Sequence, residues 1–225
     1  ARDGDGVAQT VGGDVFSVGL VSPGGAVINA TVSDLGNGTY VAYYTPATAS
    51  VYRLEIMVRG ESVGDGAYKV HVFPSHTSPA HCAAVGPGLL EATAGEAASF
   101  EITPRDSFGN ARPLIQPDVF RVSLARRGEA GGAGVPLGSL AWQPARVRDL
   151  LNGTYAAEYL VKRAGAYVVQ VQLGGIQVMG SPFQVAVIAG KTNARASTAH
   201  GAGLRSCVAG TPTSFSIVAR DEFGN

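Results

Sequence analysis

The chain has 225 residues, with 17 Lys and Arg against 17 Asp and Glu, so its formal net charge is zero. This balance argues against a nucleic-acid partner, which would call for a basic footprint. No apolar run approaches the roughly 20 residues that a membrane-spanning helix needs. Only 15% of residues are charged, 45% are hydrophobic and 31 are glycine. That mixture is typical of short buried strands joined by many turns.

An internal repeat organises the chain. The segment D-L-G-N-G-T-Y at 34–40 recurs as D-L-L-N-G-T-Y at 149–155, an offset of 115 residues (152 − 37). A-G-x-x-x-x-F at 94–100 recurs at 209–215, and R-D-x-F-G-N at 105–110 recurs at 220–225, both with the same offset. Fixed-distance self-similarity indicates a tandem array. We therefore expect a first repeat over 1–74 that lacks its N-terminal strands, a complete middle repeat over 80–189, and the truncated start of a third over 192–225.

Seven strand-like runs follow one another along the middle repeat. They lie near 81–85, 98–105, 119–125, 145–149, 154–161, 166–173 and 183–189. Within them apolar residues alternate with polar ones, and no helical periodicity appears. One buried and one wet face per strand is typical of antiparallel sheets in a sandwich. The fold class predicted is all-β: a tandem row of immunoglobulin-like antiparallel β-sandwiches.

Two tyrosines and two cysteines bear on how each sandwich is held. Tyr52 and Tyr167 each follow a turn at the start of the sixth strand, where a tyrosine hydroxyl bonds back to the backbone in many sandwiches. Cys82 and Cys207 lie 125 residues apart, so they are not equivalent positions of a 115-residue repeat. We expect them to be free thiols that pack, because they form no disulfide framework.

The middle repeat carries about 12 more residues than the first between equivalent motifs, placed in an insertion at about 126–142. A glycine-rich insertion is most simply a tolerated surface loop. The alternative is a partner-specific loop at a side edge of the sandwich.

Catalytic, cofactor and metal sites are not indicated. Gly190-Lys191-Thr192 lacks the upstream glycine of a phosphate-binding loop. The histidines around Cys82, at 71, 76 and 81, have spacings that match no usual zinc site. There is no G-x-S-x-G motif, no pair of carboxylates across a plausible cleft, and no histidine in the repeated motifs. We expect no cofactor, no metal and no enzymatic activity in this chain.

Several motifs together resemble filamin-type repeats, which have an immunoglobulin-like fold. They are G-x-G-L at 86–89 and 201–204, the A-G-x-x-x-x-F and R-D-x-x-G-N segments, D-V-F at 14–16 and 118–120, the N-G-T-Y turn, G-x-Y-x-V-x-V at 165–171, and G-S-P-F at 180–183. The resemblance covers nearly the whole chain. Repeats of this kind occur in cytoskeletal and axonemal proteins, including the tails of some outer-arm dynein heavy chains.

The resemblance implies a docking mode. In this family partner proteins add a β-strand beside the third strand, pairing with exposed backbone groups of an edge. Carried over, the candidate edge residues are Phe16, Ser17, Val18, Gly19, Leu20, Phe120, Arg121, Val122, Ser123 and Leu124. The insertion lies next to the second of these edges and either covers it or extends it. The competing interpretation is that both edges are capped and unused.

Three hypotheses for function remain open, and the least favoured is an accessory module of a carbohydrate-active enzyme, for which Trp142 is the only aromatic support. The first is a non-catalytic spacer and docking array within a larger cytoskeletal or ciliary protein, located in the cytoplasm, the cytoskeleton or an axoneme; any motor activity would lie outside this segment. The second is an extracellular adhesion array, glycosylated at the sequons that begin at Asn29, Asn37 and Asn152. Asn-Gly also has a conformational reason to stand in a tight turn, which favours the first.

Overall fold

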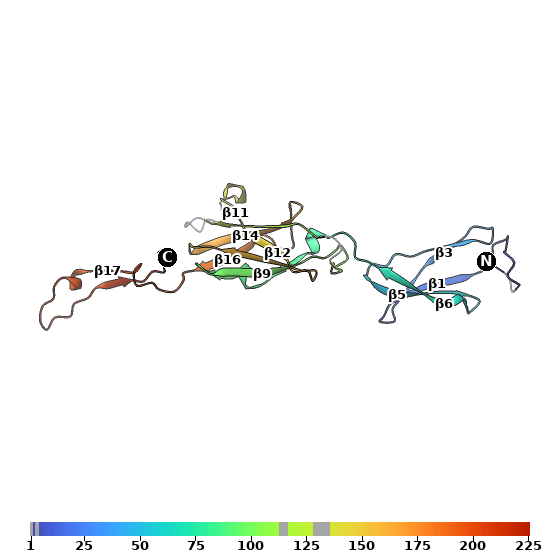
Figure 1. Cartoon of the computed structure of the whole chain (residues 1–225), viewed down its shortest axis with the longest axis horizontal. Helices are drawn as coiled ribbons and strands as arrows, with labels where there is room; N and C mark the ends of the chain where they lie inside the picture. Colours follow the sequence, from blue (N-terminus) through green and yellow to red (C-terminus); the bar gives the residue numbers. More distant parts are fainter. Residues whose placement is uncertain (1, 3–4, 113–116, 128–135) are drawn as a thin grey trace. The chain divides into compact units, whose positions relative to one another are not determined.

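The structure of the chain is a computed structural model (Figure 1). Strands joined by tight turns make up almost all of its regular secondary structure. The structure describes residues 2, 5–112, 117–127 and 136–225. Two compact units, Ala1–Ser75 and His76–Asn225, divide the chain. The short single turns of 3-10 helix that interrupt the strands are η1 (Pro79–His81), η2 (Pro87–Leu89), η3 (Leu137–Ser139) and η4 (Ala202–Leu204).

The first unit contains a four-stranded sheet and a separate hairpin. The sheet has the order β2-β1-β5-β6, and the hairpin pairs β3 with β4. The strands are β1 (Phe16–Val21), β2 (Val27–Asn29), β3 (Thr31–Asp34), β4 (Tyr40–Tyr43), β5 (Ser50–Val58) and β6 (Glu61–Val72). Val18, Leu20 and Tyr52 are its buried apolar side chains.

The second unit contains a two-sheet sandwich built from the middle repeat. One sheet has the order β12-β13-β9-β7; the other has the order β11-β10-β14-β16-β8, with β15 paired to β14. Their bounds are β7 (Ala83–Val85), β8 (Glu91–Thr93), β9 (Ala97–Thr103), β10 (Phe120–Arg126), β11 (Gln143–Pro144), β12 (Arg146–Asp149), β13 (Tyr155–Leu160), β14 (Gly165–Leu173), β15 (Ile176–Gln177) and β16 (Phe183–Ile188). Residues 192–225 add the small pair β17 (Thr198–His200) and β18 (Ser216–Val218).

The alternating pattern of the sequence places the core between the two sheets. Phe100 and Ile102 of β9 face Val122 and Leu124 of β10 across one apolar cluster, which Val169 of β14 also joins. Phe120, Val122 and Leu124 of β10 are buried and the residues between them are not, as a period of two requires. The predicted all-β class and antiparallel sandwich are therefore confirmed. The short strands β8, β11 and β15 were not predicted.

Both predicted tyrosine contacts are present. The hydroxyl of Tyr52 donates to the carbonyl oxygen of Thr48, and that of Tyr167 to the carbonyl oxygen of Arg163, each at 3.0 Å. Burial raises the pKa of Tyr167, while the nearby Arg126 and Arg163 guanidinium groups act in the opposite direction. Each hydroxyl ties its strand to the turn just before it.

The repeated Asn-Gly turns have one backbone pattern and differ at one position. Asn37 and Asn152 each accept the backbone N–H of the threonine two residues later, at 3.1 and 3.0 Å. Gly36 has φ +74°, and its counterpart Leu151 has φ +57°. Glycine adopts a left-handed backbone conformation without steric cost, whereas leucine does so with strain. The turn that contains Leu151 is therefore the more strained of the two.

The two cysteines differ in their environment. Both are free: Cys82 is buried and its thiol donates to the carbonyl oxygen of Ser78 at 3.3 Å, whereas Cys207 is exposed. The pKa of the Cys82 thiol is raised, mainly by burial and to a smaller extent by the Asp118 carboxylate. A hydrogen bond with the backbone of Arg105 acts in the opposite direction. The expectation that both cysteines pack is thus confirmed for Cys82 and wrong for Cys207.

Candidate protein-docking edge

Strand β10 carries the predicted edge of the middle repeat. Its inner neighbour is β14, and the two pair without interruption from Phe120 opposite Leu173 to Arg126 opposite Tyr167. This long pairing, together with the buried apolar side chains on alternate positions, fixes the strand rigidly. Any partner that pairs with β10 must therefore use its other, outer side.

The outer side of β10 is covered along only part of its length. β11 pairs with it at Ser123 and Leu124, and the backbone N–H of Ala145 donates to the carbonyl oxygen of Val122 at 2.9 Å. Phe120 and Arg121 lie outside this pairing. Residues 143–145, directly after the insertion, thus cover the second half of the predicted edge and leave the first half open. Most of the glycine-rich stretch, 128–135, lies outside the described residues.

A shallow groove runs beside the open half. Its floor and walls come from β10, from the return of the insertion toward β12, and from β14; the lining residues are Phe120, Arg121, Val122, Ser123, Trp142, Pro144, Ala145, Val147 and Gln172. Trp142 is held in place by its indole N–H, which donates to the carbonyl oxygen of Leu137 at 3.1 Å. An edge strand with an aromatic side chain beside it is suited to an added strand.

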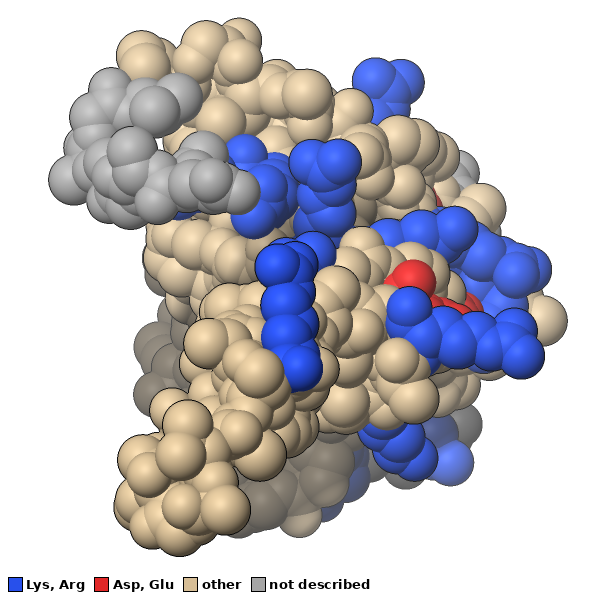
Figure 2. Space-filling view, turned by 90° about the vertical axis from the view of Figure 1, so that its left-hand side faces the viewer, with Lys and Arg blue, Asp and Glu red and all other residues tan. Residues whose placement is uncertain are grey.

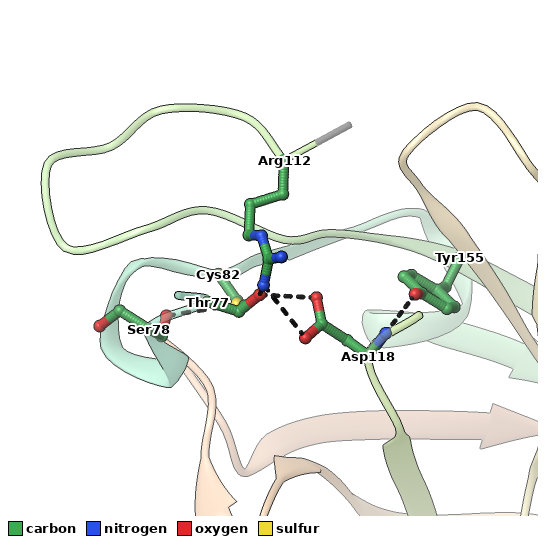
Figure 3. Close-up of polar contacts among 6 residues, drawn as sticks. All are labelled: Thr77, Ser78, Cys82, Arg112, Asp118 and Tyr155. Carbon is green, nitrogen blue, oxygen red and sulfur yellow. Dashed lines mark hydrogen bonds and ion pairs between the residues drawn. The ribbon is translucent and has the colours of Figure 1, made fainter. Parts of the chain in front are cut away.

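The start of β10 is positioned by the Asn-Gly-Thr-Tyr motif (Figure 3). The backbone N–H of Asp118 donates to the hydroxyl oxygen of Tyr155 at 2.8 Å, and the rings of Phe120 and Tyr155 pack edge to face with centroids 5.0 Å apart. Burial raises the pKa of Tyr155, and the hydrogen bond from Asp118 acts against that rise. The D-V-F and N-G-T-Y motifs therefore recur together because they contact each other.

A second group of contacts ties the beginning of the repeat to the same point (Figure 3). The hydroxyl of Thr77 donates to the Asp118 carboxylate at 2.6 Å, and the guanidinium of Arg112 donates to the Thr77 hydroxyl oxygen at 2.6 Å. Arg112 and Asp118 also form an ion pair at 3.7 Å, with both side chains largely buried. This Thr77–Arg112–Asp118 cluster holds the segment before β7 against the entry to the edge strand.

The first unit repeats this arrangement around β1. The backbone N–H of Asp14 donates to the hydroxyl oxygen of Tyr40 at 2.9 Å, and the Phe16 and Tyr40 rings lie 4.6 Å apart. β2 pairs with residues 19–21 of β1, and the backbone N–H of Ala30 donates to the carbonyl oxygen of Val18 at 2.8 Å. Within the predicted edge, residues Phe16–Val18 are the part that does not pair with β2.

Charge is unevenly divided between the two units. Residues 76–225 contain 13 Lys and Arg against 10 Asp and Glu, whereas residues 1–75 contain 4 against 7. Figure 2 shows basic side chains gathered on the face it presents, with few acidic side chains among them.

The remaining sequence-predicted positions are on the surface or apart. Asn29 lies in β2, and Asn37 and Asn152 lie in the turns; all three are exposed. Within the residues the structure describes, no group of three or more His, Cys, Asp and Glu is placed to hold a metal ion. The part of the chain that is described also contains no helix long and apolar enough to cross a membrane.

Comparison with known proteins identifies the family. The model of the Filamin/ABP280 repeat matches residues 1–69 and 76–184. The chain belongs to the filamin repeat family. Modules of this family have structural and protein-interaction roles, which is the general role of this chain.

Relatives of the filamin-repeat chain are found among cytoskeletal and flagellar proteins. Filamin-C of Mus musculus is 28% identical over 172 residues, which is 76% of this chain and 6% of the relative. The dynein alpha chain of the flagellar outer arm of Chlamydomonas reinhardtii is 32% identical over 163 residues, covering 66% of this chain and 3% of the relative. The chain therefore spans a small part of the length of these relatives.

A solved structure supports the fold alone. The Escherichia coli adhesin FdeC superimposes on the whole of this chain and 68% of its own, with a TM-score of 0.63 at 22% identity. The likeness shows a shared β-sandwich fold, and at this identity it says nothing about what this chain binds.

Proposed function

We propose that the chain is a non-catalytic spacer and protein-docking array of filamin-type repeats within a larger cytoskeletal or ciliary protein. Its repeats are 1–74, 80–189 and the beginning of a third at 192–225. The similarity to Filamin-C and to the flagellar dynein alpha chain supports this setting. The observation that carries the docking role is the open first half of β10 beside the groove around Trp142.

The proposed partner is an extended peptide segment of a cytoskeletal or axonemal protein. Added antiparallel or parallel to β10, it would pair with backbone groups at Phe120 and Arg121 and place alternate side chains in the groove. The corresponding edge of the first repeat is at Phe16–Val18. The covered halves of both strands limit direct pairing to about three residues, so groove contacts must supply most of the affinity.

Site-specific photo-crosslinking tests this docking. A photoreactive phenylalanine analogue replaces Arg121, whose side chain is exposed and lines the groove. The chain is then incubated with an isolated axonemal or actin-rich cytoskeletal fraction. We expect crosslinks to one or a few extended segments of partner proteins. The same analogue at Gln184, an exposed position of β16, serves as the background.

A matched pair of variants decides whether the crosslinks report the groove. Ala145→Glu places a carboxylate in the half-buried groove, and Ala186→Glu places one on the exposed face of β16. A desolvated, unpaired charge costs more than about 1.4 kcal/mol, so Ala145→Glu should weaken crosslinking at least about tenfold. Equal yields in the two variants, or equal yields from positions 121 and 184, would contradict docking at β10.

The extracellular alternative rests on the exposure of all three sequon asparagines. An extracellular adhesion array would carry sugar at Asn37 or Asn152. Intact-mass and glycopeptide analysis of the native protein distinguishes the two. Unmodified asparagines at all three positions are expected for the cytoskeletal or ciliary protein, and a glycan at either turn would favour the adhesion array.

A further inference from the structure

The two R-D-x-F-G-N segments form the same small loop. In the first copy, the Asp106 carboxylate accepts the backbone N–H groups of Phe108 and Asn110, each at 2.9 Å, and the Asn110 side-chain amide at 2.8 Å. In the second copy, Asp221 accepts the equivalent groups of Phe223 and Asn225 at 2.9, 2.9 and 2.6 Å. In both copies the loop is thus organised by the same hydrogen bonds among its own residues.

The second copy also bonds to the end of the middle repeat. The backbone N–H of Gly190, just after β16, donates to the Asp221 carboxylate at 2.9 Å. In the turn between β13 and β14, the side-chain oxygen of Asn225 accepts the N–H of Ala164 at 2.9 Å, and its amide donates to the carbonyl oxygen of Lys162 at 2.9 Å. Three hydrogen bonds to two separate segments define both the position and the direction of the loop.

An aromatic side chain completes the contact. Phe223 packs against the apolar core cluster of the middle repeat, and the Lys162 ammonium lies 5.7 Å from its ring centroid. Gly95 provides the space, because a Cβ atom there would overlap the Phe223 ring. The equivalent phenylalanine of the first loop, Phe108, is 62% exposed. The two loops therefore have the same hydrogen bonds, but Phe223 packs against the middle repeat and Phe108 is exposed to solvent.

The Asp221 carboxylate takes one of its hydrogen bonds from the middle repeat, through the backbone N–H of Gly190. Its side chain is 2% exposed, and each of its oxygens accepts hydrogen bonds. Removing the Gly190 N–H would leave a buried carboxylate short of one partner, which is unfavourable.

We propose that the 220–225 loop is a joint: it docks into a socket formed by Gly95, Lys162–Ala164 and Gly190, and so fixes the following repeat on the middle repeat. The partner that this socket fits is the D-x-F-G-N loop of a neighbouring filamin-type repeat. The joint lies at the end of the sandwich and shares no residue with the groove beside β10. It holds or fails independently of the proposed docking function.

Amide relaxation and hydrogen exchange of the full chain, labelled with ¹⁵N, test the joint. In the wild type we expect residues 193–225 to tumble with the middle repeat, and the amides of Ala164 and Gly190 to be protected from exchange. Phe223→Ala removes the aromatic contact but keeps the backbone N–H that Asp221 accepts. It should raise exchange at Ala164 and Gly190 at least about tenfold and shorten the correlation time of 193–225. Phe108→Ala, the matched control, should change neither.

A socket-side variant keeps the test independent of the stability of the loop. Gly95→Ala introduces the overlap with Phe223, and Gly210→Ala makes the same change at the equivalent glycine, where a Cβ meets nothing within 4 Å. Their φ values are +84° and +77°, so the backbone strain is similar. Release of 193–225 by Gly95→Ala alone supports the joint. Unchanged exchange at Ala164 and Gly190 in both Phe223→Ala and Gly95→Ala would overturn it.

Discussion

Tyr159→Phe is the most informative single change in the core of the middle repeat. The Tyr159 side chain is 5% exposed, and its hydroxyl donates to the carbonyl oxygen of Gly88 at 2.5 Å, tying β13 to η2. Phenylalanine keeps the ring and opens no large cavity, so the effect isolates the hydroxyl. The bond is lost and the carbonyl is left without that donor, which costs about 2 kcal/mol. For a sandwich of this size that corresponds to a drop in Tm of roughly 8 °C.

The same variant has a predicted pH dependence. Burial raises the pKa of Tyr159 to about 12 in the folded protein, against 10.0 for the unperturbed group. A raised folded-state pKa gives stability that is complete below pH 10 and lost as the pH rises from 10 to 12, because the unfolded chain ionises first. At pH 11 the wild type should have lost about 1.4 kcal/mol from this group, and Tyr159→Phe none.

Urea unfolding followed by the fluorescence of Trp142 measures this difference. Trp142 is the single tryptophan of the chain, so the signal reports the middle repeat alone. The gap in unfolding free energy between wild type and Tyr159→Phe should be about 2 kcal/mol at pH 8 and well below 1 kcal/mol at pH 11. A gap that is the same at both pH values would refute the argument that a buried, neutral hydroxyl carries the stabilisation.

Four further outcomes are expected. Ile102→Ala, at a fully buried position of β9, should lower the unfolding free energy of the middle repeat by about 2–5 kcal/mol in the same urea assay. Leu151→Gly should raise it by about 1 kcal/mol by relieving left-handed strain in the turn; no change would mean the turn is relaxed. Iodoacetamide should label Cys207 quickly and buried Cys82 only after unfolding. Desolvation acts to raise the pKa of Asp221, but hydrogen bonds led by the Asn225 side chain and the Gly190 N–H outweigh it and lower that pKa to about 2. A lowered folded-state pKa gives stability that is present above about pH 4 and is lost as the pH falls toward 2. The protection of the Gly190 amide, taken relative to its intrinsic exchange rate at each pH, should therefore fall in that window and stay constant at pH 5–7.

Local pattern was sufficient for the long strands of the fold. The alternation through Phe120, Val122 and Leu124 predicted the buried face of β10, and the turn before Tyr167 predicted its hydroxyl contact. β8 was missed because three residues are too few to show alternation, and because its pairing with β16 is parallel and distant in sequence.

The side-chain contacts of the candidate site were harder to predict from the sequence than the strands. The repeated D-V-F and N-G-T-Y motifs gave a signal, since both recur, but nothing local shows that Asp118 bonds to Tyr155. The contact of Arg112 with Thr77 joins segments 35 residues apart, and no local pattern in the sequence indicates it. Asp221 reads as a turn residue, and its bond to Gly190 appears only when two repeats are folded together.

The two crossovers that follow the edge strands return to them at the same backbone atom. Ala30 bonds to Val18 after 12 residues (18 to 30), and Ala145 bonds to Val122 after 23 (122 to 145). The length between these fixed points is therefore free to vary from module to module without disturbing register or packing. A row of such modules can diversify its recognition properties one crossover at a time, with each new loop presented at the same distance from the strand it flanks.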